Sequence, residues 1–284
     1  MSKSPITFCI SSHNNLPYLK IAIESVRKNS FFKDAPFIVQ SENSDDGTDE
    51  WLETHYEEYD IDYYITKSNY PMGIGGGMNF CAEKVETEYI MFLHADFYVT
   101  KDWDKRLLEQ FDNHPDEKLW VNSWRVEPQM FPNSQTRPGT VIVPKETFGA
   151  YHNDFNSDAF DEWVKLFVKD NDHTIPKGEG VSGLIKKKHW DEIGGNDPLF
   201  APASYDDMDL FLRMTREGFK FIQPSKSVVW HFGARGSHRL EENDGKSSER
   251  QQKAERENIK KWLGKWGSLP KFNEYGMIIG LEND

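Results

Sequence analysis

The sequence predicts an α/β fold in which a mostly parallel central sheet is flanked by helices. Short apolar segments alternate along the chain with segments of helical periodicity, and such alternation produces a parallel sheet with right-handed crossovers. One apolar segment, Tyr89–Leu93, has the length and unbroken hydrophobicity of a strand that is buried on both faces. Polar turns follow the predicted strands, so we expect these turns to meet at one edge of the sheet.

The first strand is expected at residues 6–10, before a polar turn at 11–15. From Leu16 onward, apolar residues recur at helical spacing, which predicts a helix. The later elements are expected as strands at 37–39, 63–66, 89–93, 119–124, 219–223 and 228–230, and as helices at 49–59, 79–85, 103–111, 206–217 and 259–266. The charged segment 241–256 is expected to be exposed, and the tail after Leu269 to be extended.

Composition and charge exclude several classes of protein. The 284 residues include 37% hydrophobic and 14% aromatic residues, which is typical of a globular chain of one large or two small domains. The formal net charge of -13 argues against binding to nucleic acid. Cys9 and Cys81 fall in a predicted strand and a predicted helix, so no disulfide is expected. Without a signal peptide or a long apolar segment, the chain is expected to be cytoplasmic, with no transmembrane segment.

A run of glycines, Gly73, Gly75, Gly76 and Gly77, leads into one predicted helix. Glycines let backbone N–H groups approach a phosphate at a helix N-terminus. The run lacks the GK[ST] ending of a P-loop, and it does not follow the first strand as a dinucleotide-binding motif would. A tight turn with close helix packing is therefore the alternative explanation for these glycines.

Asp96 lies just past the carboxyl end of the predicted strand 89–93, where ligands bind in open α/β sheets. A partly desolvated carboxylate needs a partner, and a divalent cation is a common one. The alternative is an aspartate that caps the turn after the strand. His231 follows another predicted strand of the same sheet. It is either a second metal ligand or a histidine whose hydrogen bonds are satisfied in the core or in a turn.

The regular alternation of strands and helices fades between residues 125 and 177, apart from a helical patch at 160–168. Long irregular segments in compact domains are usually functional or disordered, and the aromatic content here argues against disorder. We expect this segment to shape the pocket of a second substrate. Trp124, Tyr151 and Trp163 are candidates for stacking on that substrate, with a core position as the alternative for each.

Asp206, Asp207 and Asp209 crowd the first turn of a predicted helix that ends at Gly218. The helix dipole favours negative charge there, but capping explains only one of the three carboxylates. Asp209 and Arg213 are four residues apart and are expected to pair. The three aspartates therefore indicate a functional site.

Taken in order, these motifs resemble the GT-A glycosyltransferases of the family 2 type. The matching segments are TFCISSHNNLPYLKIAIESV, SENSDDGTDEWL, NYPMGIGGGMNFCAE, FLHADFYV, GLIKKKHWDEIGGNDPLF, SYDDMDLFLRMTREG and WHFG. The resemblance implies a GT-A fold and an inverting, metal-dependent hexosyltransferase. Such an enzyme moves a sugar from a nucleotide sugar to an acceptor hydroxyl, here expected on a glycan.

The resemblance also implies roles for individual residues. Asp96 and His231 would hold a divalent metal on the diphosphate, and an imidazole ligand favours Mn²⁺ over Mg²⁺. Asp207 would be the catalytic base. The nucleotide sugar would be bound by Ser11, His13, Asn14, Glu42, Ser44, Gly75, Asn79, His94, Ala95 and Asp96. Acceptor binding or catalytic support would come from Asp206, Asp209, Arg213, Trp124 and Tyr151.

The chain departs from the family pattern in two places. His94 replaces the first aspartate of the DxD motif, and Ser41-Glu42 replaces the usual acidic pair in the second turn, which leaves Glu42 to contact the nucleoside. UDP is the favoured nucleotide, with GDP or another nucleotide as the alternative.

We expect a single GT-A domain at residues 1–270 and a C-terminal helix and tail at 241–284. Within it, residues 1–124 would bind the nucleotide sugar, and residues 125–240 would bind the acceptor and supply the base. Two other functions remain. One is a sugar-phosphate nucleotidyltransferase, which carries its glycine-rich loop directly after the first strand, where this chain has SSHNN. The other is a non-catalytic protein of the same fold that binds carbohydrate or nucleotide sugar.

Overall fold

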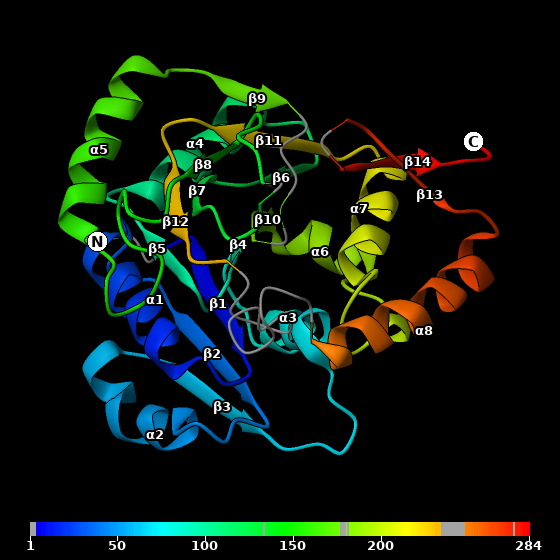
Figure 1. The fold of residues 1–284 in the computed structure, drawn as a ribbon, viewed down its shortest axis with the longest axis horizontal. Helices are drawn as coiled ribbons and strands as arrows, with labels where there is room; N and C mark the ends of the chain where they lie inside the picture. Colours follow the sequence, from blue (N-terminus) through cyan, green and yellow to red (C-terminus); the bar gives the residue numbers. More distant parts are fainter. Residues whose placement is uncertain (1–3, 133, 177–179, 181, 234–247, 275) are drawn as a thin grey trace.

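The computed structural model describes residues 4–132, 134–176, 180, 182–233, 248–274 and 276–284. Its central sheet has eight strands, which are in spatial order β3 (Asp62–Thr66), β2 (Phe37–Glu42), β1 (Ile6–Ser12), β4 (Tyr89–Leu93), β10 (Leu184–Lys186), β6 (Leu119–Val121), β11 (Lys220–Pro224) and β9 (Thr174–Pro176). All of them except β10 and β9 run in one direction (Figure 1). The predicted α/β fold with a mostly parallel sheet is therefore confirmed.

Side chains at alternate positions of the strands point to opposite faces of this sheet. Phe8 and Ile10 of β1 pack on one face with α1 (Leu16–Asn29), α2 (Thr48–Tyr59) and α4 (Trp103–Asn113). Cys9 of β1 and Phe92 of β4 pack on the other face with α3 (Gly73–Glu83), α6 (Lys187–Ile193) and α7 (Asp206–Arg216). The sheet thus lies between two layers of helices and has a hydrophobic core on each side.

A smaller sheet has four strands in the order β5 (Phe97–Val99), β12 (Val228–His231), β7 (Trp124–Pro128) and β8 (Thr140–Val143). The helix α5 (Ser157–Asp170) packs on it through Phe160, in a core that includes Tyr98 and Trp230. The strand expected at 119–124 is two strands, because the chain leaves the central sheet at Asn122 and enters the smaller one. The segment 125–177 is therefore more regular than expected, since its aromatic residues form a core of their own.

The C-terminal part contains η1 (Pro198–Phe200), α8 (Glu249–Trp266), β13 (Pro270–Phe272) and β14 (Ile278–Leu281). The closing helix starts ten residues before the expected position, since the Ser248 side chain accepts from the Gln251 N–H and caps it. The expected charged segment falls partly on 241–247, outside the described residues. The Asn258 amide donates to the carbonyl oxygens of Phe200, Ala203 and Ser204, so α8 holds the loop that enters α7.

No helix in the described part of the chain combines the length and the apolar character that crossing a membrane requires.

Candidate active site

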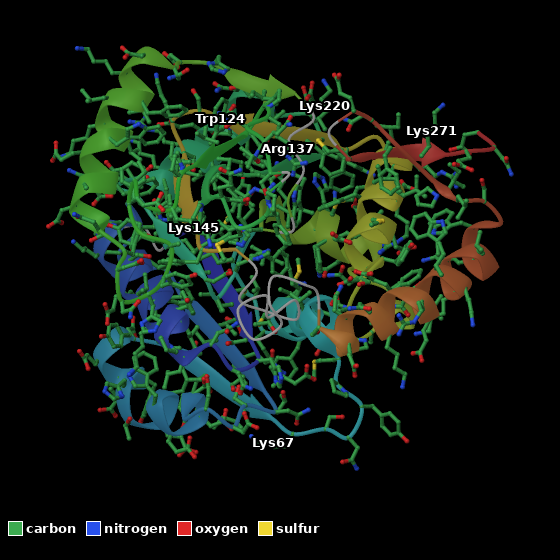
Figure 2. All side chains as sticks on the ribbon, in the orientation of Figure 1. Lys67, Trp124, Arg137, Lys145, Lys220 and Lys271 are labelled. Carbon is green, nitrogen blue, oxygen red and sulfur yellow. The ribbon has the colours of Figure 1, made fainter. Side chains whose placement is uncertain are left out.

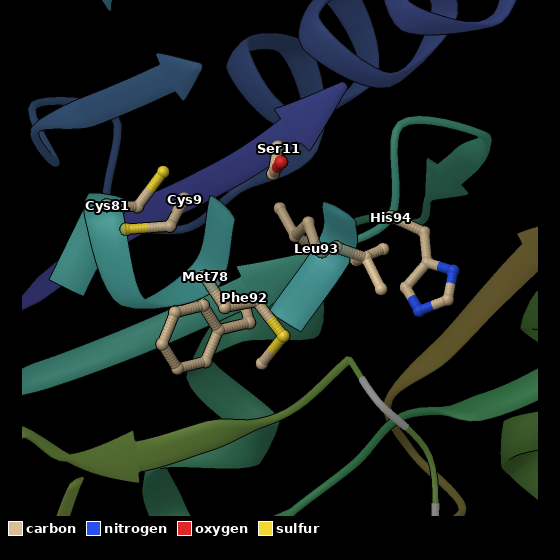
Figure 3. Close-up of a pocket in the computed structure, with 8 residues that line it drawn as sticks. Cys9, Ser11, Met78, Cys81, Phe92, Leu93 and His94 are labelled. Atoms are coloured by element: carbon tan, nitrogen blue, oxygen red, sulfur yellow. The ribbon is translucent and has the colours of Figure 1, made fainter. Parts of the chain in front are cut away.

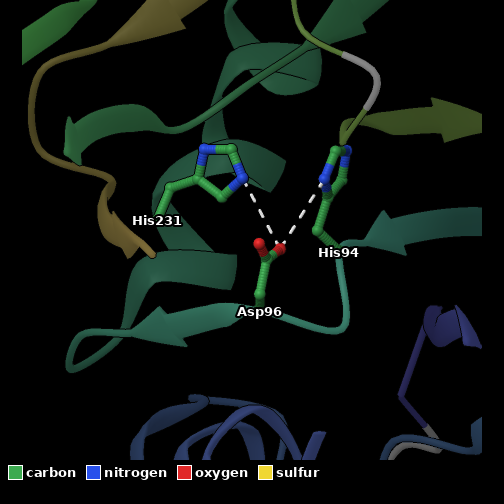
Figure 4. Close-up of side chains that lie close together, drawn as sticks. All are labelled: His94, Asp96 and His231. Atoms are coloured by element: carbon green, nitrogen blue, oxygen red, sulfur yellow. Dashed lines mark ion pairs between the residues drawn. The ribbon is translucent and has the colours of Figure 1, made fainter. Parts of the chain in front are cut away.

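His94, Asp96 and His231 form a compact group at the edge of the two sheets (Figure 4). His94 and Asp96 lie in the turn between β4 and β5, and His231 is the last residue of β12, opposite Phe97 of β5. One nitrogen or oxygen of each side chain lies within 4.8 Å of the others, and the Asp96 Oδ1 atom is 3.5 Å from His231 Nε2 and 3.9 Å from His94 Nδ1. The expected approach of Asp96 and His231 is thus seen in the structure, but β12 belongs to the smaller sheet and not, as expected, to the sheet that contains β4.

Glu127 supports this group from β7. Its Oε1 atom is 2.8 Å from His231 Nδ1, which leaves His231 Nε2 directed at Asp96. Burial disfavours the charged form of His231, but Asp96 and Glu127 outweigh it and raise the pKa of His231 to about 9. Burial likewise disfavours ionised Glu127, but the hydrogen bond and charge of His231, with nearby arginines, lower its pKa to about 2. Nothing in the sequence identified Glu127, because only the pairing of β7 with β12 places it there.

The imidazole of His94 is held in its neutral form. Burial and the charge of His231 lower the pKa of His94 to about 4, and its ring stacks on Phe97. A neutral imidazole is the form that binds metals, and a cation bound between His231 Nε2 and Asp96 would displace the proton of His231. Two imidazoles and one carboxylate match the ligand preferences of a first-row divalent cation such as Mn²⁺. The residues present therefore fit a divalent metal.

Polar groups of the expected nucleotide site gather at the ends of β1 and β2. Ser11 Oγ donates to Gln40 Oε1 at 2.6 Å, and His13 Nδ1 is 2.7 Å from the Glu42 carbonyl oxygen. The Asn14 N–H donates to Ser44 Oγ at 3.0 Å, which fixes the turn after β1 against the turn after β2. The structure thus brings Ser11, His13, Asn14 and Ser44 together, as the motif pattern predicted.

Lys67 is a cation that the sequence analysis missed at this edge. It directly follows β3, at the end of that strand (Figure 2). Its Nζ atom is 2.6 Å from Asp49 Oδ2 and donates to the Ser44 carbonyl oxygen at 3.0 Å. The signal that would have found it is its position directly after a predicted strand, the same signal that identified Asp96.

Two residues expected to bind the nucleotide hold α3 in place. Glu42 accepts from the backbone N–H groups of Met72 and Gly73, at 2.6 and 3.0 Å. Asn79 makes two hydrogen bonds with the backbone of Asn196, at 2.8 and 2.9 Å. In both cases the polar atoms expected to reach the ligand are held by backbone groups.

The glycine run does not lead into α3 but forms its first turns, since α3 begins at Gly73. A Cβ atom at Gly75 would lie 3.0 Å from Asp206 Oδ2, and one at Gly77 would lie 1.9 Å from Ser11 Oγ. These glycines therefore allow α3 to approach β1 and α7 closely. Close helix packing accounts for the run, and phosphate binding by Gly75 has no support in this geometry.

The three aspartates of α7 differ in their surroundings. Asp209 is fully buried and receives hydrogen bonds from Arg213 and Trp266 and an ion pair from Lys265, so the expected pair with Arg213 is confirmed. Asp206 is also buried, and burial together with the charge of Asp207 raises its pKa to about 7. Asp207 is half-buried, and burial raises its pKa as well. Asp207 thus combines a raised pKa with access to solvent.

The three aromatic candidates for acceptor binding differ in their surroundings. Trp163 is partly buried, stacks on Phe160 and Phe167, and packs against the core of the smaller sheet. Trp124 is a core residue: it is 7% exposed, its Nε1 donates to the Gln223 carbonyl oxygen, and its ring packs on Phe167. The stacking role expected for Trp124 is therefore wrong. Tyr151 is half-buried, and Lys145 Nζ lies 5.9 Å from the centre of its ring. Tyr151 thus keeps a position that a ligand can reach.

A model of the family "Glycosyl transferase family 2" matches residues 7–168. The chain belongs to glycosyl transferase family 2. No curated protein matches it. A solved structure of GalNAc-T7 with UDP, GalNAc and Mn²⁺ aligns with a TM-score of 0.58 at 13% identity, over 80% of this chain and 43% of that chain. The structure of S. aureus TarS aligns with a TM-score of 0.50 at 14% identity, over 80% of this chain and 36% of that chain.

The chain spans less than half the length of these two structures, and at such identities the likeness shows the fold alone, which is the GT-A fold. In this family 2 member, His94 lies in the group with Asp96 and His231. Ala95, between His94 and Asp96, packs on the core beside β1 and β4.

Behind His94, the family 2 domain encloses a small cavity between β1, β4 and α3 (Figure 3). Cys9, Cys81 and Met78 line it together with Ser11. Burial and the neighbouring Cys81 raise the pKa of the Cys9 thiol, which keeps it protonated and unreactive. The two cysteines are therefore core residues, and both are free.

Proposed function

We propose that this family 2 member transfers a sugar from a nucleoside diphosphate sugar to an acceptor hydroxyl of a glycan, with inversion and with Mn²⁺ or Mg²⁺. UDP is the favoured nucleotide. The observation that carries the proposal is the group His94, Asp96 and His231 at the ligand-binding edge of the sheet. The GalNAc-T7 structure of similar fold contains UDP and Mn²⁺, which supports the choice of nucleotide and metal.

His94, Asp96 and His231 would hold the metal, and Glu127 would fix the orientation of His231. A bound divalent cation stabilises the negative charge that develops on the diphosphate as the glycosidic bond breaks. Ser11, His13, Asn14, Ser44 and Lys67 lie at the ends of β1, β2 and β3, where they can contact the nucleoside and ribose. In this proposal, residues 1–124 would bind the donor and residues 125–240 would bind the acceptor.

Asp207 is the proposed catalytic base. In an inverting transfer, the base takes the proton from the acceptor hydroxyl as its oxygen bonds to the anomeric carbon, and the bond to the diphosphate breaks on the opposite face. Asp209 is held by two cations and Asp206 is buried, so Asp207 is the member of the three that an acceptor can reach. Its raised pKa also suits proton transfer.

Calorimetric titration with UDP tests the proposal. The wild type should bind UDP with Mn²⁺ present, and either EDTA or Asp96→Ala should abolish this binding. Asp116→Ala removes an exposed carboxylate between α4 and β6 and serves as the matched control. UDP affinity that resists both chelation and Asp96→Ala would contradict the metal site. Binding of nucleotide sugars without turnover would favour the non-catalytic alternative.

A further inference from the structure

A second small cavity adjoins the metal-binding group on the side of the smaller sheet. It has a volume of about 10 Å³, close to the smallest space that holds one water molecule. The lining residues are His94, Phe97, Asn122, Ser123, Arg125 and Ser182, with Gly180. His94 therefore belongs both to this cavity and to the proposed metal site.

Most polar atoms of the cavity wall already have partners inside the protein. These pairs are Ser123 Oγ with Ser227 Oγ at 2.7 Å, Ser182 Oγ with the Phe92 carbonyl oxygen at 2.7 Å, and the Asn122 amide nitrogen with the carbonyl oxygens of Gly180 and Ser182 at 2.8 and 2.6 Å. Two buried atoms have no hydrogen-bond partner among the described residues: Asn122 Oδ1 and Arg125 Nε. One is an acceptor and the other a donor.

Neighbouring residues fix both side chains in place. Arg125 has one terminal nitrogen 3.9 Å from Glu127 Oε1, and the other donates to Thr140 Oγ1 at 3.4 Å. A Cβ atom at Gly180 would lie 3.1 Å from the Asn122 amide nitrogen and 3.8 Å from Arg125 Cζ. Asn122 and Arg125 therefore both border Gly180, and a larger residue at that position would crowd the Asn122 amide.

We propose that Asn122 Oδ1 and Arg125 Nε form a subsite for one hydroxyl group of the donor sugar. A hydroxyl both donates and accepts, so it offers a proton to Asn122 Oδ1 and a lone pair to Arg125 Nε, whereas a carboxylate has no proton for Asn122 and an ammonium has no lone pair for Arg125. The donor sugar is bonded to the diphosphate, which the proposed metal site would hold beside His94. The inference thus rests on the proposed function.

This subsite would make the enzyme selective for that hydroxyl. A site built to hydrogen-bond a hydroxyl discriminates strongly against an analogue that lacks it, because its own buried polar groups then stay unpaired. A water molecule that remained in the cavity after donor binding would satisfy the same atoms and give no such selectivity. Affinity for deoxy donors therefore separates the two cases.

The test measures donor affinity by calorimetry with Mn²⁺ and without acceptor. UDP-glucose, UDP-galactose and their N-acetylamino forms are screened first, and then the monodeoxy analogues of the tightest binder. In the wild type, loss of one particular hydroxyl should weaken binding by about tenfold or more. In Arg125→Lys, which keeps the charge but moves the donor atom, loss of the same sugar hydroxyl should weaken binding by less than about threefold.

Arg106→Lys is the matched control, because Arg106 pairs with the nearby Glu109 on α4 and its replacement should leave the discrimination unchanged. If Arg125→Lys does not fold, the wild type is compared instead with Asn122→Ser, which lacks Oδ1. Equal discrimination by the wild type and the folded variant, or no sensitivity to any sugar hydroxyl, would overturn the subsite while the proposed function stands. Failure of every nucleotide sugar and of UDP to bind the wild type would overturn the proposed function itself.

Discussion

Asp209→Ala would remove a fully buried carboxylate that several donors share. Asp209 accepts from Arg213 Nε at 2.8 Å and Trp266 Nε1 at 2.9 Å, and lies 2.6 Å from Lys265 Nζ. Removing one partner of a buried ion pair costs about 3–5 kcal/mol, because the remaining charge stays uncompensated. Here each cation keeps another contact: Lys265 reaches Asp197, and Arg213 donates to two backbone carbonyls. We therefore expect a cost of about 3 kcal/mol.

This cost converts into a shift of the melting temperature. The entropy of unfolding is about 2.1 cal/mol/K per residue, which gives about 0.6 kcal/mol/K for 284 residues. The Tm of Asp209→Ala should then fall by about 5 °C, measured by calorimetry. Asp191→Ala breaks an exposed pair with Lys187 on α6 and is the control, with an expected shift below about 1 °C. Equal shifts for the two variants would refute the reasoning.

Three more predictions concern the base and the packing of α3. Asp207→Asn should lower turnover by about two to four orders of magnitude and leave UDP affinity nearly unchanged, since a general base acts in the transition state. The pKa of Asp206 is raised to about 7, so the folded state binds the proton more tightly than the unfolded state does, and stability should fall as pH rises from about 4 to about 7. Gly77→Ala should destabilise the protein by about 1–3 kcal/mol, because its Cβ would lie 1.9 Å from Ser11 Oγ.

Each of these has a direct check. NMR of the product should show an anomeric configuration opposite to that of the donor, and a retained configuration would contradict the role of Asp207. Asp206→Asn should remove its part of the pH dependence of Tm, so parallel curves for this variant and the wild type would contradict the raised pKa. Gly264→Ala, in α8 with open space around its Cβ, should be neutral or stabilising, and an equal loss at Gly77 and Gly264 would contradict the close packing of α3.

The sequence predicted features that depend on local patterns. Tyr89–Leu93 is a strand of the central sheet, with Asp96 in the turn that follows it, because a continuous apolar segment and a polar turn are both short-range signals. The pairing of Asp209 with Arg213 also follows from helical spacing alone. For the same reason, the order of strands and helices up to β4 agrees with the structure.

Features that depend on long-range contacts were missed. Glu127 meets His231 only because β7 and β12 are neighbours in the smaller sheet, although the two residues are far apart in sequence. The Asn79 side chain is hydrogen-bonded to the backbone of Asn196, and Trp124 is buried in the core around α5. Both contacts also join residues that are far apart in sequence. Sequence identifies a residue type suited to a ligand, but only the fold decides whether its polar atoms are already occupied.

The position of α3 links parts of the chain that the sequence assigns to different substrates. Glu42 at the end of β2 holds the start of this helix, Gly75 brings it against Asp206, and Asn79 fastens it to Asn196. A displacement of α3 would therefore disturb both the end of β2 and Asp206, which precedes the proposed base. We therefore expect a substitution that shifts α3 to alter donor affinity and acceptor turnover together.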